Sequence, residues 1–280
     1  MKWIVLIISL FHGLALACPF CVEEKSDPSR YMIDQNAQIQ SHLGRETFEQ
    51  VATEVYNLYE EEFKNQNRPT KLNLFWDVPY FSAWAVQEDG QDLQHESFSI
   101  NFWGGMARIP GMTEKGWAFT ACHEIGHILA GMPRTELDTM RWASSEGQAD
   151  YFAAAQCLKR YYLQKDLDKD LPGALPPLIL DLCHRFHQTD KMKRVCEHVA
   201  EAALSFAHVL YYIFPDDGLA SLTNPSHQHV ERTIINSYPD IQCRIDTILS
   251  GALCDKDPLS KDWICEKNQG FRPNCWFNSF

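Results

Sequence analysis

The chain has 280 residues, of which 45% are hydrophobic and 12% aromatic, so it can bury the core of one ordinary domain with peripheral additions. Its formal net charge of −12 disfavours nucleic acid as a partner, because phosphate contacts need clustered Lys and Arg side chains. The acidity predicts little more, since most surface carboxylates are simply solvated.

The first seventeen residues have the composition of a secretory signal peptide. Lys2 precedes an apolar run, and small residues stand at Ala15 and Ala17, where cleavage would occur. We therefore expect an exported protein, periplasmic or extracellular. An alternative is a lipoprotein anchored at Cys18, because Ala15 to Cys18 resembles a bacterial lipobox. A membrane-spanning anchor is a further alternative, although the apolar run is short for one, and no later segment is expected to span a bilayer.

Ten cysteines in an exported chain predict disulfide bonds. For Cys18 and Cys21 we expect a plain structural bridge, because no second pair with matching spacing lies nearby to complete a metal site. Most cysteines from Cys183 to Cys275 should be paired, and Cys183 and Cys196 could join neighbouring helices. The sequence leaves the connectivity open.

The N-terminal half contains one predicted helix and three predicted strands. Residues 18–43 are polar and irregular, which indicates an N-terminal arm. Apolar residues at helical spacing predict a helix from Glu46 to Asn65. Alternating sequences predict strands that should form a small antiparallel or mixed sheet. These strands are Lys71–Trp76, Ser82–Val86 and Ser97–Trp103.

Two further helices should follow the strands. Thr113 can cap a helix that runs to about Ala130, where Gly131 ends it. The next helix is predicted from Thr139 to Tyr162.

The C-terminal half is predicted to be mainly helical. After a Pro-rich connection at residues 171–177, three or four helices reach Leu253. The last residues, 254–280, hold three cysteines and few periodic apolar positions, which indicates a disulfide-tied tail. The whole pattern predicts an α+β fold, with residues 44–253 as its one domain.

The first of the two central helices carries the pattern His-Glu-x-x-His. His123 and His127 are four residues apart, so on a helix they share one face and can bind a single ion. Glu124 would project beside that ion, where a water molecule would sit. Surface histidines on a helix can produce the same pattern. Here the flanking residues are mostly apolar, and buried charged groups need partners.

The next helix supplies two carboxylates at the same spacing. Glu146 and Asp150 can both face the first helix. Two histidines and Glu146 would leave a fourth position open, the pattern of a catalytic zinc site, and these ligand types favour zinc over calcium or magnesium. Asp150 is predicted to accept a hydrogen bond from the outer N–H of His123. Alternatively, both acids could simply complement the helix macrodipole.

The other histidines and two central cysteines are interpreted as structural or solvated. Cys122 and Cys157 are expected to be buried thiols or disulfide partners. The histidines in this group are His184, His187, His198, His208, His227 and His229.

The order of the motifs resembles a known family. His-Glu-x-x-His followed by Glu-x-x-Ala-Asp is similar to the gluzincin metallopeptidases that include the CAAX prenyl protease and HtpX. Three further segments resemble family elements: Ser82–Ala85 the Asn-Ala-aromatic-Ala segment, Ser99–Met106 the following edge strand, and Ser237–Pro239 with Arg244 the Ser-x-His-Pro…Arg-Ile element. The resemblance covers about residues 45–252 and implies a zincin-like fold.

The resemblance also implies an activity. We expect a zinc-dependent endopeptidase that acts on peptides or proteins through a zinc-bound water, with Glu124 as the general base. Arg244 matches the family's arginine and is the first candidate donor to the oxyanion, although it could be an ordinary surface ion pair. Tyr238, the second candidate, replaces the family's histidine. The rival functions are a zinc-stabilised binding protein or pseudoenzyme, which would not need Glu124, and a hydrolase of non-peptide amides.

A substrate-binding strand is the last expectation. Ser97–Trp103 alternates between polar and apolar residues and precedes Gly104 and Gly105. As an edge strand beside the zinc helix, it would bind an extended peptide through main-chain hydrogen bonds. Alternatively, the N-terminal arm or the tail could cover it.

Overall fold

The computed structural model describes residues 31–88, 96–167, 173, 175–266 and 269–278. The predicted signal peptide, Cys18 and Cys21 therefore lie outside the described residues. Within the described ranges, no helix is long and apolar enough to cross a membrane.

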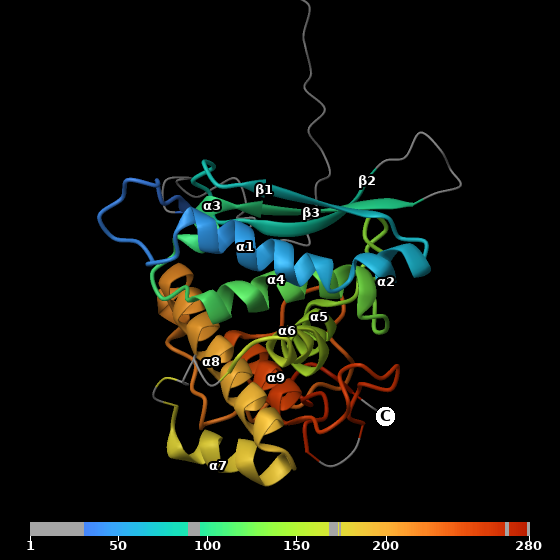
Figure 1. Ribbon diagram of the computed structural model, residues 1–280. Coiled ribbons are helices and arrows are strands. Elements are labelled where there is room, and N and C mark those ends of the chain that lie inside the picture. The colour runs from blue at the N-terminus through green and yellow to red at the C-terminus, as the bar shows by residue number, and fades with distance from the viewer. Residues whose placement is uncertain (1–30, 89–95, 168–172, 174, 267–268, 279–280) are drawn as a thin grey trace, which may run out of the picture.

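A three-stranded sheet lies at one end of the molecule, and the helices extend away from it (Figure 1). Its strands, in the order β1-β3-β2, are β1 (Thr70–Phe75), β3 (Ser97–Trp103) and β2 (Ala83–Glu88). β1 runs parallel to β3, whereas β2 runs antiparallel to it. The predicted α+β class with a small mixed sheet is confirmed.

The inner face of the sheet packs on the helices through alternate residues. Ile100 and Phe102 of β3 are buried, and the register places them opposite Ala85 and Ala83 of β2. The ring of Phe102 lies 5.1 Å from that of Trp117. Because the β2 residues on this face are alanines, the helix that carries Trp117 can lie close beneath the strand.

β3 is the central strand, so the prediction that Ser97–Trp103 forms an edge is wrong. Both of its ladders are occupied, one by β1 and the other by β2. Its polar residues belong to the outer face of the sheet, where the amide of Asn73 donates to Asn101 (2.9 Å) and Asn101 donates to Ser99 (3.0 Å). The alternation in sequence reports the two faces of a strand and not its place in the sheet.

The predicted helix at Glu46–Asn65 is divided into α1 (Arg45–Asn57) and α2 (Glu60–Asn65). The break allows Tyr59 to be fully buried under the guanidinium of Arg160, 5.1 Å from the ring centroid. α1 is anchored to the next long helix, because the indole N–H of Trp117 donates to the carbonyl of Phe48 (3.0 Å).

The central helix α4 (Glu114–Leu129) begins where the sequence predicts, with the Thr113 hydroxyl accepting from the N–H of Gly116 (3.2 Å). The following helix starts later than predicted, at Glu146. Residues before it are held in a loop, since the N–H of Ser144 donates to the His127 carbonyl (2.9 Å). The other elements of this half are α3 (Gly104–Ala107), α5 (Glu146–Phe152), the π-helix η2 (Ala153–Cys157) and α6 (Leu158–Leu163).

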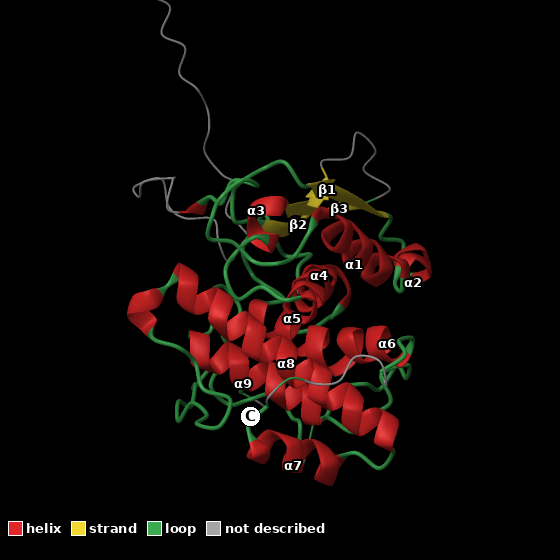
Figure 2. Cartoon of the chain, turned by 60° about the vertical axis from the view of Figure 1, so that its left-hand side comes forward, coloured by secondary structure: helices red, strands yellow, loops and turns green. Residues whose placement is uncertain are grey.

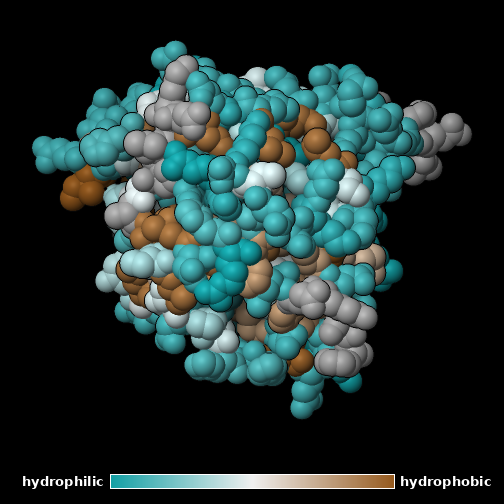
Figure 3. Space-filling model, turned by 60° about the horizontal axis from the view of Figure 1, so that its bottom comes forward, coloured by the Kyte–Doolittle hydropathy of each residue, from teal (hydrophilic) through white to brown (hydrophobic). Residues whose placement is uncertain are grey.

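The C-terminal half is helical, as predicted, up to Leu253. Its elements are α7 (Pro177–Phe186), α8 (Asp190–Ile213), the short 3₁₀ helix η3 (Pro215–Asp217) and α9 (Ile241–Leu253). α8 contacts both α4 and α9, and α7 lies at the end of the molecule opposite the sheet (Figure 1). The face at this helical end is mostly hydrophilic, with hydrophobic residues in separate small groups (Figure 3).

Four disulfide bonds join the described cysteines. They are Cys122–Cys157, Cys183–Cys196, Cys243–Cys275 and Cys254–Cys265. The predicted link between Cys183 and Cys196 is confirmed, and it joins α7 to α8. The predicted attachment of the tail is confirmed by Cys243–Cys275, which ties it to α9. So many disulfides are typical of proteins in oxidising compartments.

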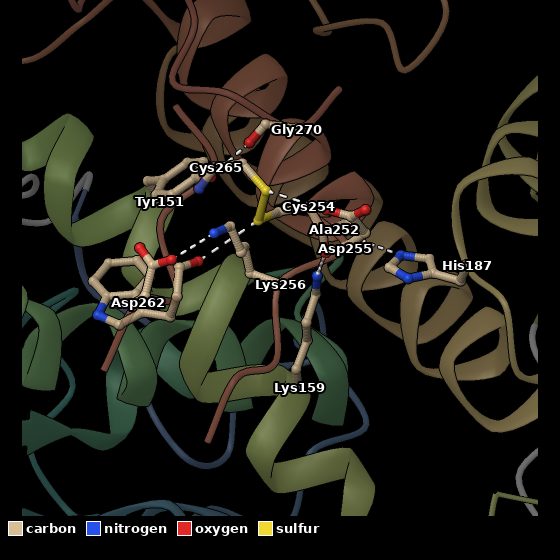
Figure 4. The surroundings of a disulfide bond; sticks show 11 residues. Tyr151, Lys159, His187, Ala252, Cys254, Asp255, Lys256, Asp262, Cys265 and Gly270 are labelled. Carbon is tan, nitrogen blue, oxygen red and sulfur yellow. Dashed lines mark hydrogen bonds and ion pairs between the residues drawn. A yellow bond between two sulfur atoms is a disulfide. The ribbon is translucent and has the colours of Figure 1, made fainter. Parts of the chain in front are cut away.

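A lysine is fully buried under the loop closed by Cys254 and Cys265. The ammonium group of Lys159 donates to the backbone carbonyl of Cys254, and the hydroxyl of Tyr151 donates to the carbonyl of Gly270 at 2.6 Å (Figure 4). Burial lowers the pKa of Lys159 to about 7, although Asp255 opposes the change. The folded protein therefore holds this amine largely neutral above neutral pH.

Lys159 should make the protein more stable as the pH rises from about 7 to about 10. In that range the unfolded chain keeps the amine protonated, since its ordinary pKa is 10.5, and so binds more protons than the folded chain does. The free energy of unfolding can be measured in urea for the oxidised wild type and for Lys159→Met. Between pH 7 and pH 10 the wild type should gain a few kcal/mol relative to the variant, on the order of 1.4 kcal/mol per unit of pKa. A difference that does not change with pH would contradict a neutral Lys159.

Candidate metal centre

The two central helices approach each other closely at a glycine. A Cβ added at Gly126 of α4 would lie 3.0 Å from the Cα of Ala149 in α5, tighter than ordinary contact. Any larger residue at Gly126 would push the helices apart. Figure 2 shows α5 beside α4, on the side away from the sheet. This contact brings the two histidines of α4 to the two carboxylates of α5.

The three predicted ligands converge on one point. The Nε2 atoms of His123 and His127 are 3.1 Å apart, and they lie 3.2 Å and 3.6 Å from the carboxylate oxygens of Glu146. All three side chains are buried. Within the described part of the chain, no other group of His, Cys, Asp or Glu is arranged so that it could hold a metal ion.

Acceptor groups beside the outer nitrogens orient both imidazoles. Nδ1 of His123 lies 2.8 Å from a carboxylate oxygen of Asp150, and Nδ1 of His127 lies 2.9 Å from the Ser144 carbonyl. Both partners can only accept, so in each ring Nδ1 carries the proton that is donated. Asp150 occupies the position predicted for it. The two Nε2 lone pairs then point at the same space.

This arrangement needs a positive charge at its centre. Two nitrogen lone pairs at 3.1 Å repel each other, and a carboxylate beside them adds negative charge. Burial lowers the pKa of His123, but Asp150 and Glu146 outweigh it and raise the pKa to about 10. In the metal-free protein the positive charge is therefore a proton on His123. A divalent metal ion can take its place.

Arg244 of α9 lies behind the two carboxylates. Its Nε and Nη2 donate to the two oxygens of Asp150, both at 2.8 Å, and Nη2 is 3.8 Å from Glu146. Burial opposes ionisation of Asp150, yet Arg244 and His123 hold the pKa of this carboxyl well below its ordinary value. The guanidinium thus fixes Asp150, which in turn fixes His123.

Glu124 and Tyr238 are the remaining predicted site residues. Glu124 follows His123 on α4 and is buried. Tyr238 is 38% exposed, and its ring centroid lies 5.7 Å from the guanidinium carbon of Arg244. The structure therefore gathers all the predicted site residues around α4 and α5.

The other histidines have structural contacts where they are buried. Nε2 of His187 lies 2.9 Å from the Ala252 carbonyl, and burial lowers its pKa to about 4. His198 stacks on Tyr162 with ring centroids 5.0 Å apart. Cys122 and Cys157 are disulfide partners, one of the two expected outcomes, and their bond links α4 to η2.

Sequence reasoning missed the partners that are not ionisable. The Ser144 carbonyl is a backbone group, so its contact with His127 cannot be predicted from the residue type at position 144. The C-terminal tail also contacts α5, where the indole of Trp276 packs on Gly147. The nearest signal in the sequence was Cys243, whose disulfide draws the tail to the residue beside Arg244.

Comparison of the chain with protein-family models, with curated proteins and with solved structures finds no match. Inferences about function therefore rest on the geometry of this site.

The metal-free protein should bind one divalent ion per chain, with Zn²⁺ as the probe. Its affinity should increase with pH up to about pH 10, because a proton on His123 competes with the ion. His127→Ala should lose the ion, and Asp150→Asn should weaken binding about 10–100-fold. Elemental analysis and calorimetric titration measure these outcomes. Folded protein that holds no stoichiometric metal after loading would contradict the site.

Proposed function

We propose that this chain is an exported, zinc-dependent endopeptidase with a zincin-like fold. His123, His127 and Glu146 would hold the zinc, and Glu124 would act as the general base. The observation that supports this most strongly is the convergence of two oriented imidazole lone pairs and a carboxylate next to Glu124. The four disulfides support export.

The donor atoms fit zinc in kind and in spacing. Two imidazole nitrogens and one carboxylate oxygen are the ligand set of many catalytic zinc sites. Bonds of about 2.0–2.1 Å in a tetrahedron separate the ligand atoms by about 3.3 Å. The Nε2 atoms of His123 and His127 are 3.1 Å apart, and each lies near a different oxygen of Glu146, His123 at 3.2 Å from Oε2 and His127 at 3.6 Å from Oε1. Three protein ligands would leave a fourth position for water or substrate.

The proposed reaction is hydrolysis of a peptide bond. Zinc, when bound, lowers the pKa of a water molecule and polarises a carbonyl oxygen. Glu124 accepts a proton from the attacking water and returns it to the departing amine. Arg244 already donates twice to Asp150, so we assign it to holding that carboxylate. Tyr238, partly exposed beside Arg244, is the better candidate to donate to the oxyanion.

A zinc-stabilised binding protein remains the alternative function. The ligands are nearly inaccessible, since Glu146 is 8% exposed and both histidines less, which also suits a structural ion. Such a protein would gain nothing from a carboxylate at Glu124. The two functions therefore differ in what happens when this one side chain is neutralised.

Glu124→Gln should keep the fold and the zinc but lose nearly all peptidase activity, because the amide cannot accept the proton. The change is nearly isosteric. Glu114→Gln, at the exposed first turn of the same helix, is the matched control and should behave as the wild type. The assay is cleavage of a peptide library by zinc-loaded protein. Wild-type cleavage rates for Glu124→Gln would refute its role as base, and an inactive, zinc-loaded wild type would favour the binding protein.

β2 offers an edge next to the zinc helix for an extended peptide. Trp103 N–H donates to the Ser82 carbonyl, so in antiparallel pairing Ala83, Ala85 and Gln87 point their backbone groups away from β3. Among the described residues no strand pairs with β2 on that side, and the bridge between Met32 and Tyr80 lies before β2 begins.

If substrates pair with β2, methylating the backbone nitrogens of a cleaved peptide one at a time should impair cleavage at every second nitrogen. Gln87→Pro should raise KM several-fold without breaking the sheet, because this N–H faces the free edge. The measurement is kcat and KM on each peptide, with folding checked by circular dichroism. An effect with no alternation, together with an unchanged KM for Gln87→Pro, would exclude strand pairing at β2.

A further inference from the structure

The helix α5 has two faces with different partners. Glu146 and Asp150 face α4, whereas Gly147 and Tyr151 face the C-terminal tail. A Cβ added at Gly147 would overlap the indole ring of Trp276, and the Tyr151 hydroxyl donates to the Gly270 carbonyl at 2.6 Å. The tail therefore packs on α5 directly behind the proposed metal ligand.

Trp276 is itself held firmly in place. Its side chain is fully buried, and its backbone carbonyl accepts from the N–H of Ile234 at 2.8 Å. The preceding residue, Cys275, is joined by a disulfide to Cys243 of α9, next to Arg244. The indole ring thus packs on α5 from a segment that a disulfide bond joins to the residue beside Arg244.

α5 needs such support at its N-terminus. It begins a helical run that continues through η2 and α6 to Leu163, and the side chain of its N-cap Ser145 makes no capping hydrogen bond. Glu146 is the first residue of this run, so packing on both faces of the first turn must fix it. On one face the packing is Gly126 against Ala149. On the other, the absence of a side chain at Gly147 lets Trp276 rest directly on the backbone that carries Glu146.

We propose that Trp276 is a positioning residue for the metal ligand Glu146, and that the C-terminal tail completes the metal centre from behind. Trp276 contacts the backbone of α5 and sets how closely Glu146 approaches the two histidines. A second tail contact acts in the same direction, since Arg272 donates to Gln148 (3.0 Å), which donates to the Ala130 carbonyl (3.0 Å). The proposal rests on the proposed zinc site.

The first test compares tryptophan variants by zinc affinity, measured in competition with a chromophoric chelator, and by the visible spectrum of the Co²⁺-loaded protein. Trp276→Ala should weaken zinc binding about 10–100-fold, as expected when a ligand loses its support. Trp276→Phe keeps a ring on Gly147 and should stay within about threefold of the wild type. The Co²⁺ spectrum should change only for Trp276→Ala, because it reports ligand geometry.

Trp263→Ala is the matched control for loss of a buried indole. Trp263 belongs to the same tail but packs on Tyr151 and Phe152, with ring centroids 5.9 Å and 5.5 Å away, and not on Gly147. This variant should lose stability yet keep wild-type zinc affinity. If Trp263→Ala weakened zinc binding as much as Trp276→Ala, the effect would be general destabilisation and the proposal would be overturned.

The second test changes Gly147, the other partner in the contact, and it still tests the proposal if Trp276→Ala does not fold. Gly147→Ala drives a methyl group into the indole ring, so zinc affinity should fall. Adding Trp276→Leu makes room for that methyl group, and the double variant should bind zinc more tightly than Gly147→Ala alone. Additive losses would overturn the proposal. A wild type that binds no zinc would instead contradict the proposed function itself.

Discussion

The close approach of α4 and α5 at Gly126 is the contact on which the site depends. It brings two imidazoles and two carboxylates together among buried side chains. Once they are buried, each of these groups must have a partner, because an unpaired buried charge is strongly unfavourable. The arrangement around them follows from that requirement.

The partners form a series of contacts in which each group compensates the charge or fixes the orientation of the next. Arg244 neutralises Asp150, Asp150 fixes the tautomer of His123, and the Ser144 carbonyl does the same for His127. Only the Nε2 atoms and Glu146 are left to face one another, and they need a positive charge, which either a proton on His123 or a metal ion can supply. This is why the group can hold a metal ion.

Support for the centre comes from segments that are far apart in the chain. α8 and α9 lie behind α4 and α5, the Cys122–Cys157 bond links α4 to η2, and the tail closes the remaining side of α5. A zinc site with three protein ligands and an open position is typical of catalysis, whereas structural sites are usually closed by four. In the proposed peptidase, the same rigidity that fixes the ligands would hold Glu124 beside the zinc-bound water.

The sequence by itself determined what depends on neighbours within a few residues. Helical periodicity paired His123 with His127 and Glu146 with Asp150, and the Thr113 cap marked the start of α4. Tertiary structure alone decided the central place of β3, the late start of α5 at Glu146, the pairing of Arg244 with Asp150 and the contact of Trp276 with Gly147. Each of these joins residues distant in sequence, and no local pattern encodes such a contact, because it exists only after the chain has packed.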